Sequence, residues 1–196
     1  MKTPLLLAAM TAAGLCACDA IPRSTYSMSS ASMLPTLVEG DIIGADGWKG
    51  DCGRAKPAPG QVVIYRREGQ HFVARAVAEA GQMVELKGGR LSIDGKPVTS
   101  VAAGSHSIDF LGSPRTVDVF RETLANGASY LTLDMGPDGE LDDIPPTRLT
   151  GWYVLGDHRD NAADSRFHGS VAEADICAAA TSIIMAKDVS RVGQRP

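Results

Sequence analysis

The sequence predicts a mainly β fold, and three observations support this class. The 196 residues include 21 Gly and 11 Pro, which favour turns over long helices. Hydrophobic residues make up 44% of the chain, and many stand in short Val, Ile and Leu runs of strand length. The chain shows no internal repeat and no long amphipathic helical pattern. Its length suits one domain, or a core domain with a smaller insertion.

Charge and motif spacing exclude several classes of function. The formal net charge is −4, so the chain offers no basic surface of the kind that binds nucleic acid. No spacing of Cys and His residues is typical of a metal site. We therefore expect no nucleic-acid partner, no metal and no cofactor.

The N-terminal segment predicts export. Residues 4–17 are largely apolar, shorter than the roughly 20 residues of a membrane-spanning helix but typical of a signal peptide, which we place at residues 1–17. The sequence Leu15-Cys16-Ala17-Cys18 resembles a bacterial lipobox, in which Cys18 would become the lipidated first residue. An ordinary cleaved signal peptide and an uncleaved anchor are the alternatives. All three place the protein outside the cytoplasm, and we expect it on the periplasmic side of the inner membrane, lipid-anchored or secreted.

Two further cysteines, Cys52 and Cys177, belong to the exported part of the chain. That compartment permits a disulfide between them. Buried free thiols are the alternative, because the sequence does not give the separation of the two residues.

The first half of the chain predicts a polar linker and a strand hairpin. Residues 18–29 are mostly polar and lead into the first motif. A short apolar strand over 41–45 precedes a loop rich in Gly, Pro and charge. Strands are then expected over 59–65 and 71–77, as hairpin partners.

The second half predicts further hairpins. Gly-rich turns separate expected strands at 83–86, 91–93 and 97–98, and Asn126-Gly127 joins strands at 116–124 and 129–133. The acidic, Pro-rich stretch 138–146 is expected to be a loop. A strand at 151–155, a long motif loop and an apolar run at 176–185 complete the chain. We interpret residues 30–82 and 150–190 as a β core, and 83–149 as a smaller β domain inserted into it.

Two stretches carry the chemistry. Ser30 and Ser32 precede Met33-Leu34-Pro35-Thr36-Leu37, where Pro35 cannot continue a helix, so the hydroxyl of Ser32 should lie on a loop of defined shape. The second stretch runs from Gly156 to Arg166. Together they resemble bacterial type I signal peptidase, a membrane-bound serine protease with a Ser–Lys dyad. The resemblance covers roughly residues 29–186 and implies a signal-peptidase-like β core with an inserted β domain.

The resemblance assigns roles to individual residues. It implies that Ser32 is the nucleophile and that Ser30 supplies the side-chain donor of the oxyanion hole. The remaining residues that match the family's motifs are Met33, Pro35, Arg75, Gly156, Asp157, Arg159, Asp160, Asn161, Asp164, Ser165 and Arg166. Of these, Asp164 and Arg166 resemble a structural ion pair.

The catalytic lysine of the family is missing. Its position, just before Arg75, is occupied by Ala74, and the serine that orients the lysine is replaced by Ala162. His158 replaces an asparagine of the family motif and is a possible substitute base, since histidine titrates near neutral pH. His71 is three residues before Ala74, so on a strand its side chain should leave from the opposite face.

Three functions follow as hypotheses. The first is a divergent serine endopeptidase that cuts exported precursor proteins at the outer face of the inner membrane. The second is a catalytically inactive relative that binds extended segments of preproteins or partners. The third is a specialised maturation protease for pilins or conjugation proteins. In each, the partner is a preprotein or peptide close to a membrane.

Overall fold

The computed structural model describes residues 24–47, 52–110, 112–136, 139 and 141–196. The expected signal peptide, Cys18 and the first part of the linker lie outside these residues. Within the described part the fold is mainly β, so the predicted fold class is confirmed. The described strands form three antiparallel sheets.

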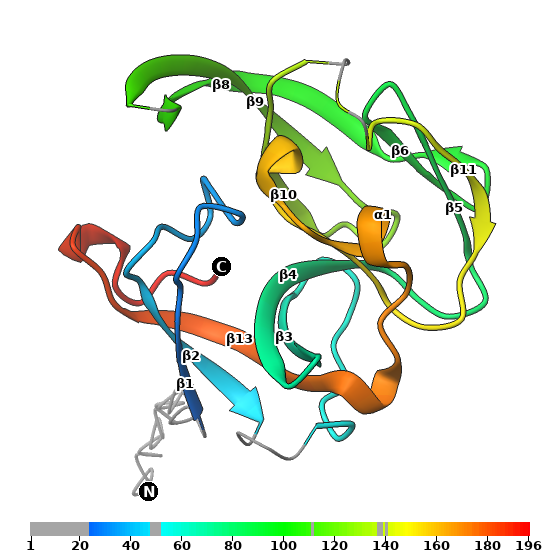
Figure 1. Ribbon diagram of the computed structural model, residues 1–196, viewed down its shortest axis with the longest axis horizontal. Helices are drawn as coiled ribbons and strands as arrows, with labels where there is room; N and C mark the ends of the chain where they lie inside the picture. Colours follow the sequence, from blue (N-terminus) through cyan, green and yellow to red (C-terminus); the bar gives the residue numbers. More distant parts are fainter. Residues whose placement is uncertain (1–23, 48–51, 111, 137–138, 140) are drawn as a thin grey trace, which may run out of the picture.

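The largest sheet has six strands in the order β1-β2-β13-β3-β4-β12. They are β1 (Ser24–Ser27), β2 (Ile42–Gly47), β3 (Val62–Arg67), β4 (Gln70–Ala78), β12 (Tyr153–Leu155) and β13 (Ile176–Met185). β13 pairs with β3 over residues 176–179 and with β2 over residues 178–185, so residues 178–179 lie between the two strands. Figure 1 shows β13 beside β2, so the end of the chain completes a sheet that its first strands begin.

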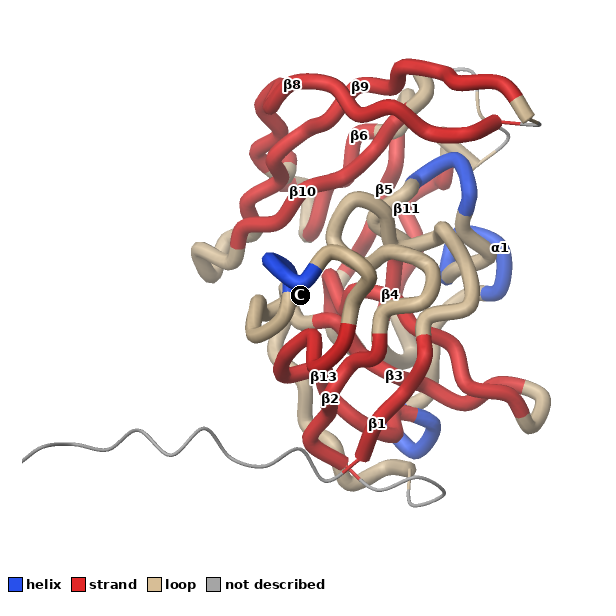
Figure 2. Tube along the Cα trace, turned by 90° about the vertical axis from the view of Figure 1, so that its left-hand side faces the viewer, coloured by secondary structure: helices blue, strands red, loops and turns tan. Residues whose placement is uncertain are grey.

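Two smaller sheets come from the middle of the chain and lie away from β1, β2 and β13 (Figures 1 and 2). One has the order β10-β9-β8, with β8 (Thr99–Phe110), β9 (Ser113–Thr123) and β10 (Ser129–Asp134). The other has the order β11-β5-β6-β7, with β5 (Met83–Lys87), β6 (Arg90–Ile93), β7 (Lys96–Pro97) and β11 (Ile144–Arg148). That residues 83–149 form a domain inserted into the β core remains a proposal.

Helical structure in the described residues is limited to single turns. The motif loop after β12 holds the 3-10 turn η1 (Arg159–Asn161) and the helix α1 (Ser165–His168). Two more 3-10 turns, η2 (Glu173–Asp175) and η3 (Val189–Arg191), flank β13.

The core of the six-stranded sheet has apolar side chains on both faces. In β3, Val62 and Ile64 pack into one cluster, while Val63 and Tyr65 pack into another. This alternation is what a strand buried on both sides requires. The first cluster also contains Met33 and continues into the turn that carries Ser32.

Two loop predictions are corrected. Residues 24–27, predicted as part of a linker, form β1, which pairs with β2 as an edge strand. Ser24 and Tyr26 are buried and alternate with exposed residues, so the strand buries only one of its faces. A mostly polar segment can therefore form it. Residues 144–148, expected to be partly loop, form β11, whose ladder with β5 is interrupted between Ile144 and Thr147. Two prolines occupy that interruption, where no ladder donor is needed.

Candidate functional site

Buried neighbours hold the turn that carries Ser32. Met33 and Leu37 are fully buried in the core, and the backbone N–H of Leu37 donates to the carbonyl of Met33 (2.9 Å). Ser32 itself stays partly exposed. The apolar anchors therefore fix the backbone while leaving the hydroxyl accessible.

The two serines of the turn lie together. The Oγ atoms of Ser30 and Ser32 are 3.0 Å apart, within hydrogen-bonding distance. The backbone N–H of Ser32 is directed at the Ser30 Oγ over 3.5 Å. The Ser30 hydroxyl and the Ser32 N–H therefore lie next to each other, and both are donors of the kind that an oxyanion hole uses.

Ser32 opens into a cavity of about 340 Å³ that also contains both substituted positions. Ala74 from β4 and Ala162 from the motif loop line this cavity together with Ser32. Ala74 is 3% exposed and lies opposite Val63 in the β3–β4 ladder. The structure thus brings Ser32, Ala74 and Ala162 to one place.

One wall of the cavity is the edge of a β-strand. β12 pairs with β4 only at Arg75, Ala76 and Ala78. Residues 70–74 of β4 have no described strand on that edge, and all five line the Ser32 cavity. The segment 27–30 lines it as well. An extended peptide could therefore add to β4 as a further strand and place its backbone beside Ser32.

The motif loop contacts the Ser32 turn at close range. The N–H of His158 donates to the carbonyl of Ser32 (3.0 Å). A Cβ at Gly156 would lie 2.8 Å from that carbonyl oxygen and 2.3 Å from the Ala162 Cβ. Only glycine permits this approach, which explains the residue type at position 156.

A buried ion pair connects β4 to the motif loop and the Ser32 turn. Arg75 donates from Nε and Nη2 to the two carboxylate oxygens of Asp157 (2.8 and 2.6 Å). The Thr36 hydroxyl also donates to Asp157, and Arg75 Nη1 donates to the carbonyl of Gly60. Burial lowers the pKa of Arg75, but the adjacent Asp157 carboxylate outweighs this and raises it overall. The residue beside Ala74 is thus held charged and rigid.

A second buried pair ties the motif loop to β9. Arg159 donates from Nη1 and Nη2 to the two carboxylate oxygens of Glu122 (2.8 and 2.6 Å), and both residues are about 5% exposed. The hydroxyl of Tyr130 on β10 donates to the same carboxylate (3.0 Å). Sequence reasoning missed Thr36 and Glu122 as partners, because each lies far along the chain from the residue that it contacts. It missed Tyr130 because the contact of Tyr130 with Glu122 depends on how β9 and β10 pair.

The end of the motif loop is closed by Asp164. Its carboxylate accepts from Arg166 Nε (3.0 Å) and from the backbone N–H of Gly156 (2.9 Å). The hydroxyl of Ser165 accepts from the N–H of Val154 on β12 (2.9 Å). Asp160 accepts from the N–H of Met135, which joins the loop to the end of β10. These contacts stabilise the loop and do not reach Ser32.

His158 lies on the other side of the Ser32 turn. Its Nδ1 is 3.2 Å from the carbonyl oxygen of Ala31, and its Nε2 is buried with no hydrogen-bond partner among the described residues. The side chain is 2% exposed and lines a second cavity, whose described lining does not include Ser32. Burial lowers the pKa of His158 below its ordinary value near 6.5, although the Ala31 carbonyl opposes this shift.

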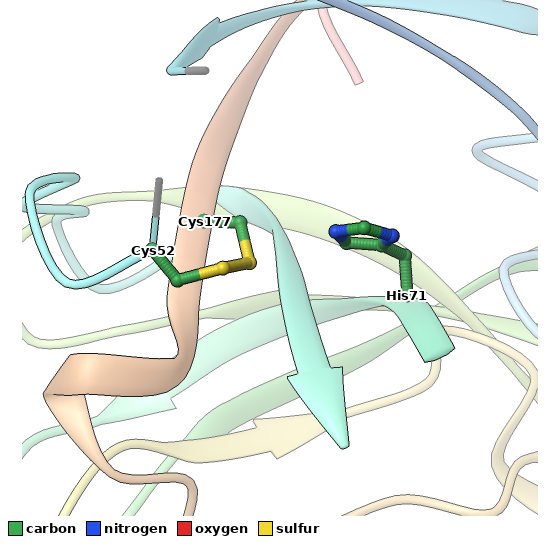
Figure 3. A group of neighbouring side chains, drawn as sticks. All are labelled: Cys52, His71 and Cys177. Carbon is green, nitrogen blue, oxygen red and sulfur yellow. A yellow bond between two sulfur atoms is a disulfide. The ribbon is translucent and has the colours of Figure 1, made fainter. Parts of the chain in front are cut away.

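His71 lines the Ser32 cavity but lies beside a disulfide (Figure 3). Cys52 and Cys177 are bonded to each other, and a nitrogen of His71 lies within 4.8 Å of both sulfur atoms. The His71 ring also contacts the ring of Tyr26, with the ring centroids 5.5 Å apart. His71 and Ala74 both line the cavity because the cavity runs along the free edge of β4.

No described helix is long and apolar enough to cross a membrane.

The fold and this turn-and-loop arrangement define a signal-peptidase-like serine peptidase scaffold. The family model of signal peptidase, peptidase S26, matches residues 3–185, and the chain belongs to this family. The resemblance found in the sequence is therefore confirmed.

Individual relatives agree with this assignment. The chain is 29% identical to inactive signal peptidase IA of Staphylococcus aureus over 145 residues, which cover 74% of this chain and 68% of the relative. It is also 29% identical to signal peptidase I T of Bacillus subtilis (strain 168) over 143 residues, or 72% of this chain and 62% of the relative. Signal peptidase I of Bacillus amyloliquefaciens is 29% identical over 107 residues, which cover 55% and 46% of the two chains.

Proposed function

We propose that this chain is a signal peptidase-family protein that binds extended segments of exported proteins without cleaving them. The observation that carries the proposal is the pair of methyl groups at Ala74 and Ala162 in the cavity of Ser32. A serine hydroxyl needs a general base to act as a nucleophile, and neither position supplies one or orients one.

The other titratable groups in the described lining of this cavity are engaged elsewhere. Asp164 is bonded to Arg166 and to the N–H of Gly156, and burial raises the pKa of Tyr65 to about 12. His71 lies against the disulfide and Tyr26. No hydrogen bond between described residues links any of these groups to Ser32. His158, whose side chain lines the second cavity, is in our proposal a residue that positions the Ser32 turn.

The binding function is supported by what the site retains. The free edge of β4 and the segment 27–30 leave room for an added strand, whose backbone hydrogen bonds provide affinity. Relatives named inactive signal peptidase IA give precedent in the family for a chain without peptidase activity. The family suggests a preprotein as the bound molecule, and we propose that the chain holds it at the periplasmic side of the inner membrane, through a lipid on Cys18 or after secretion.

Cleavage by Ser32 is the second candidate, because the proposed nucleophile Ser32 and the proposed oxyanion donor Ser30 are both present, with their Oγ atoms 3.0 Å apart. The test uses the purified full chain in detergent with a labelled preprotein, beside a Ser32→Ala variant. We expect the preprotein to stay intact with both proteins. Cleavage by the wild type that disappears in Ser32→Ala would establish a working peptidase and contradict the proposal.

Binding is measured in parallel with a fluorescent extended peptide of small residues. Ser29 is exposed and lines the Ser32 cavity, so Ser29→Trp should fill the site and weaken binding at least tenfold. Ser113→Trp, at an exposed position of β9 outside the described lining of this cavity, is the matched control and should leave the affinity unchanged. Equal affinities for the two variants would place binding elsewhere on the molecule.

A further inference from the structure

A second cavity of about 470 Å³ adjoins the Ser32 cavity. The Ser32 turn separates the two: Ser30 and Ser32 line the first, and Ala31 lines the second. Asn161 lines both. A segment that runs through the Ser32 cavity and past Asn161 therefore brings its next side chains to the second cavity.

The second cavity combines acidic and apolar groups. Glu39, Asp109 and Asp160 contribute carboxylates, and no Lys or Arg is present among its described lining residues. Its larger apolar lining residues are Leu34, Val38, Ile108 and Met135. A long side chain with an apolar stem and a cationic end matches both properties, because its methylene groups can lie on the apolar wall while the charge reaches the carboxylates.

His158 supplies an independent indication of a hydrogen-bond donor. The carbonyl of Ala31 can only accept, so the proton of the neutral imidazole is on Nδ1 and Nε2 carries a lone pair. That lone pair is buried and has no donor among the described residues. Buried acceptors are nearly always paired in folded proteins. Because His158 lines the second cavity, an ammonium or guanidinium group bound there lies on the same wall as this unpaired acceptor.

We propose that this acidic cavity binds a lysine or arginine side chain of the bound segment, a few residues from the position held at Ser32. The inference rests on the proposed peptide-binding function and adds a charge preference to it. The Ser32 cavity, in contrast, has one described carboxylate in its lining, Asp164, and this is paired with Arg166. The two cavities thus select for different chemistry in one segment.

The test uses the full chain in detergent and a peptide series built on the small-residue peptide. Each peptide carries one lysine, and the series places it at successive positions up to four residues on either side of the centre. Matched peptides carry norleucine at the same positions, because its side chain is uncharged and similar in length to that of lysine. We expect lysine to bind about tenfold tighter than norleucine at one or two neighbouring positions on one side, which is the scale of a charge-assisted hydrogen bond. The preference should shrink as salt is raised.

A double variant identifies the groups responsible. Asp109→Asn with Glu39→Gln should reduce the lysine preference to less than threefold, and Asn at 109 keeps an oxygen for the N–H of Gly112. Asp118→Asn, an exposed carboxylate outside the described lining, is the control and should keep the preference. A peptide that binds without any lysine preference would overturn this inference alone, whereas no binding of any peptide would overturn the proposed function.

Discussion

At the scale of single residues, the site differs from a Ser–Lys protease by two side chains that meet in space. Ala74 and Ala162 belong to a strand and a loop that are far apart in the chain, and both line the cavity of Ser32. The base and the hydroxyl that would orient it are absent together. Under the proposed function, the two substitutions would belong to one coupled loss and not to two independent changes.

Restoring both side chains should therefore restore chemistry. In the double variant Ala74→Lys, Ala162→Ser, the new lysine replaces a residue that is 3% exposed, so desolvation should lower its pKa and make it a base. We expect preprotein cleavage to rise by at least about 10²-fold, the lower end of the usual contribution of a general base. The measurement is cleavage of the labelled preprotein, with Ser32→Ala added to the double variant as the control. A folded double variant that stays inert would refute the coupled-loss argument.

His158 should make stability depend on pH. Its pKa is lowered in the folded chain, so below about pH 6.5 the unfolded chain binds a proton that the folded chain resists. The free energy of unfolding should therefore fall as the pH is lowered from 7.5 to 5.5. Urea unfolding of the wild type and of His158→Asn checks this, since the variant lacks the titrating group. Parallel pH profiles for the two proteins would show that His158 does not contribute.

At the scale of elements, buried ion pairs hold the motif loop between two sheets. The Arg75–Asp157 pair fixes it to β4 of the large sheet, and the Arg159–Glu122 pair fixes it to β9. Each arginine engages both oxygens of its partner, which adds geometric definition to the contact. The two pairs thus hold the loop in place against the Ser32 turn.

Breaking the pair to β9 should be costly. Glu122→Ala leaves Arg159 buried without its carboxylate, and such a change costs about 3–5 kcal/mol in the free energy of unfolding. Chemical denaturation measures the loss. Arg66→Ala is the comparison, because the Arg66–Asp175 pair is more than 40% exposed and should contribute less than about 1 kcal/mol. Similar losses for the two variants would contradict the role given to the buried pair.

At the scale of the whole molecule, the disulfide joins distant parts of the chain. Cys52 lies in the segment between β2 and β3, and Cys177 lies in β13, 125 residues further on. The bond therefore closes a loop that contains both smaller sheets and the motif loop. Closing so long a loop restricts the unfolded chain strongly.

Removal of this bond should lower the free energy of unfolding by about 2–5 kcal/mol. Urea unfolding of the wild type with and without reductant measures the change, and the Cys52→Ser, Cys177→Ser variant should match the reduced protein. The stability of the double-serine variant should not respond to reductant. A wild type equally insensitive to reductant would show that the bond is absent or adds nothing.

The sequence predicted most of the strands whose side chains are apolar, and it missed those that are polar. β3, β4 and β13 were expected because their Val and Ile runs must be buried. β8 was not expected, since its small and polar residues are mostly exposed and it forms by pairing with β9. β1 was also not predicted, because its residues are mostly polar and it forms by pairing with β2.

The sequence by itself determined the family, the exposed serine turn and the two alanines, because these depend on residue types at fixed local spacing. Only the tertiary structure decided which side of the turn His158 occupies, and that Cys52 and Cys177 meet beside His71. It also decided that β4 leaves a free edge beside Ser32. These features depend on how segments distant in the chain pack and pair, and no local pattern of residues encodes that packing.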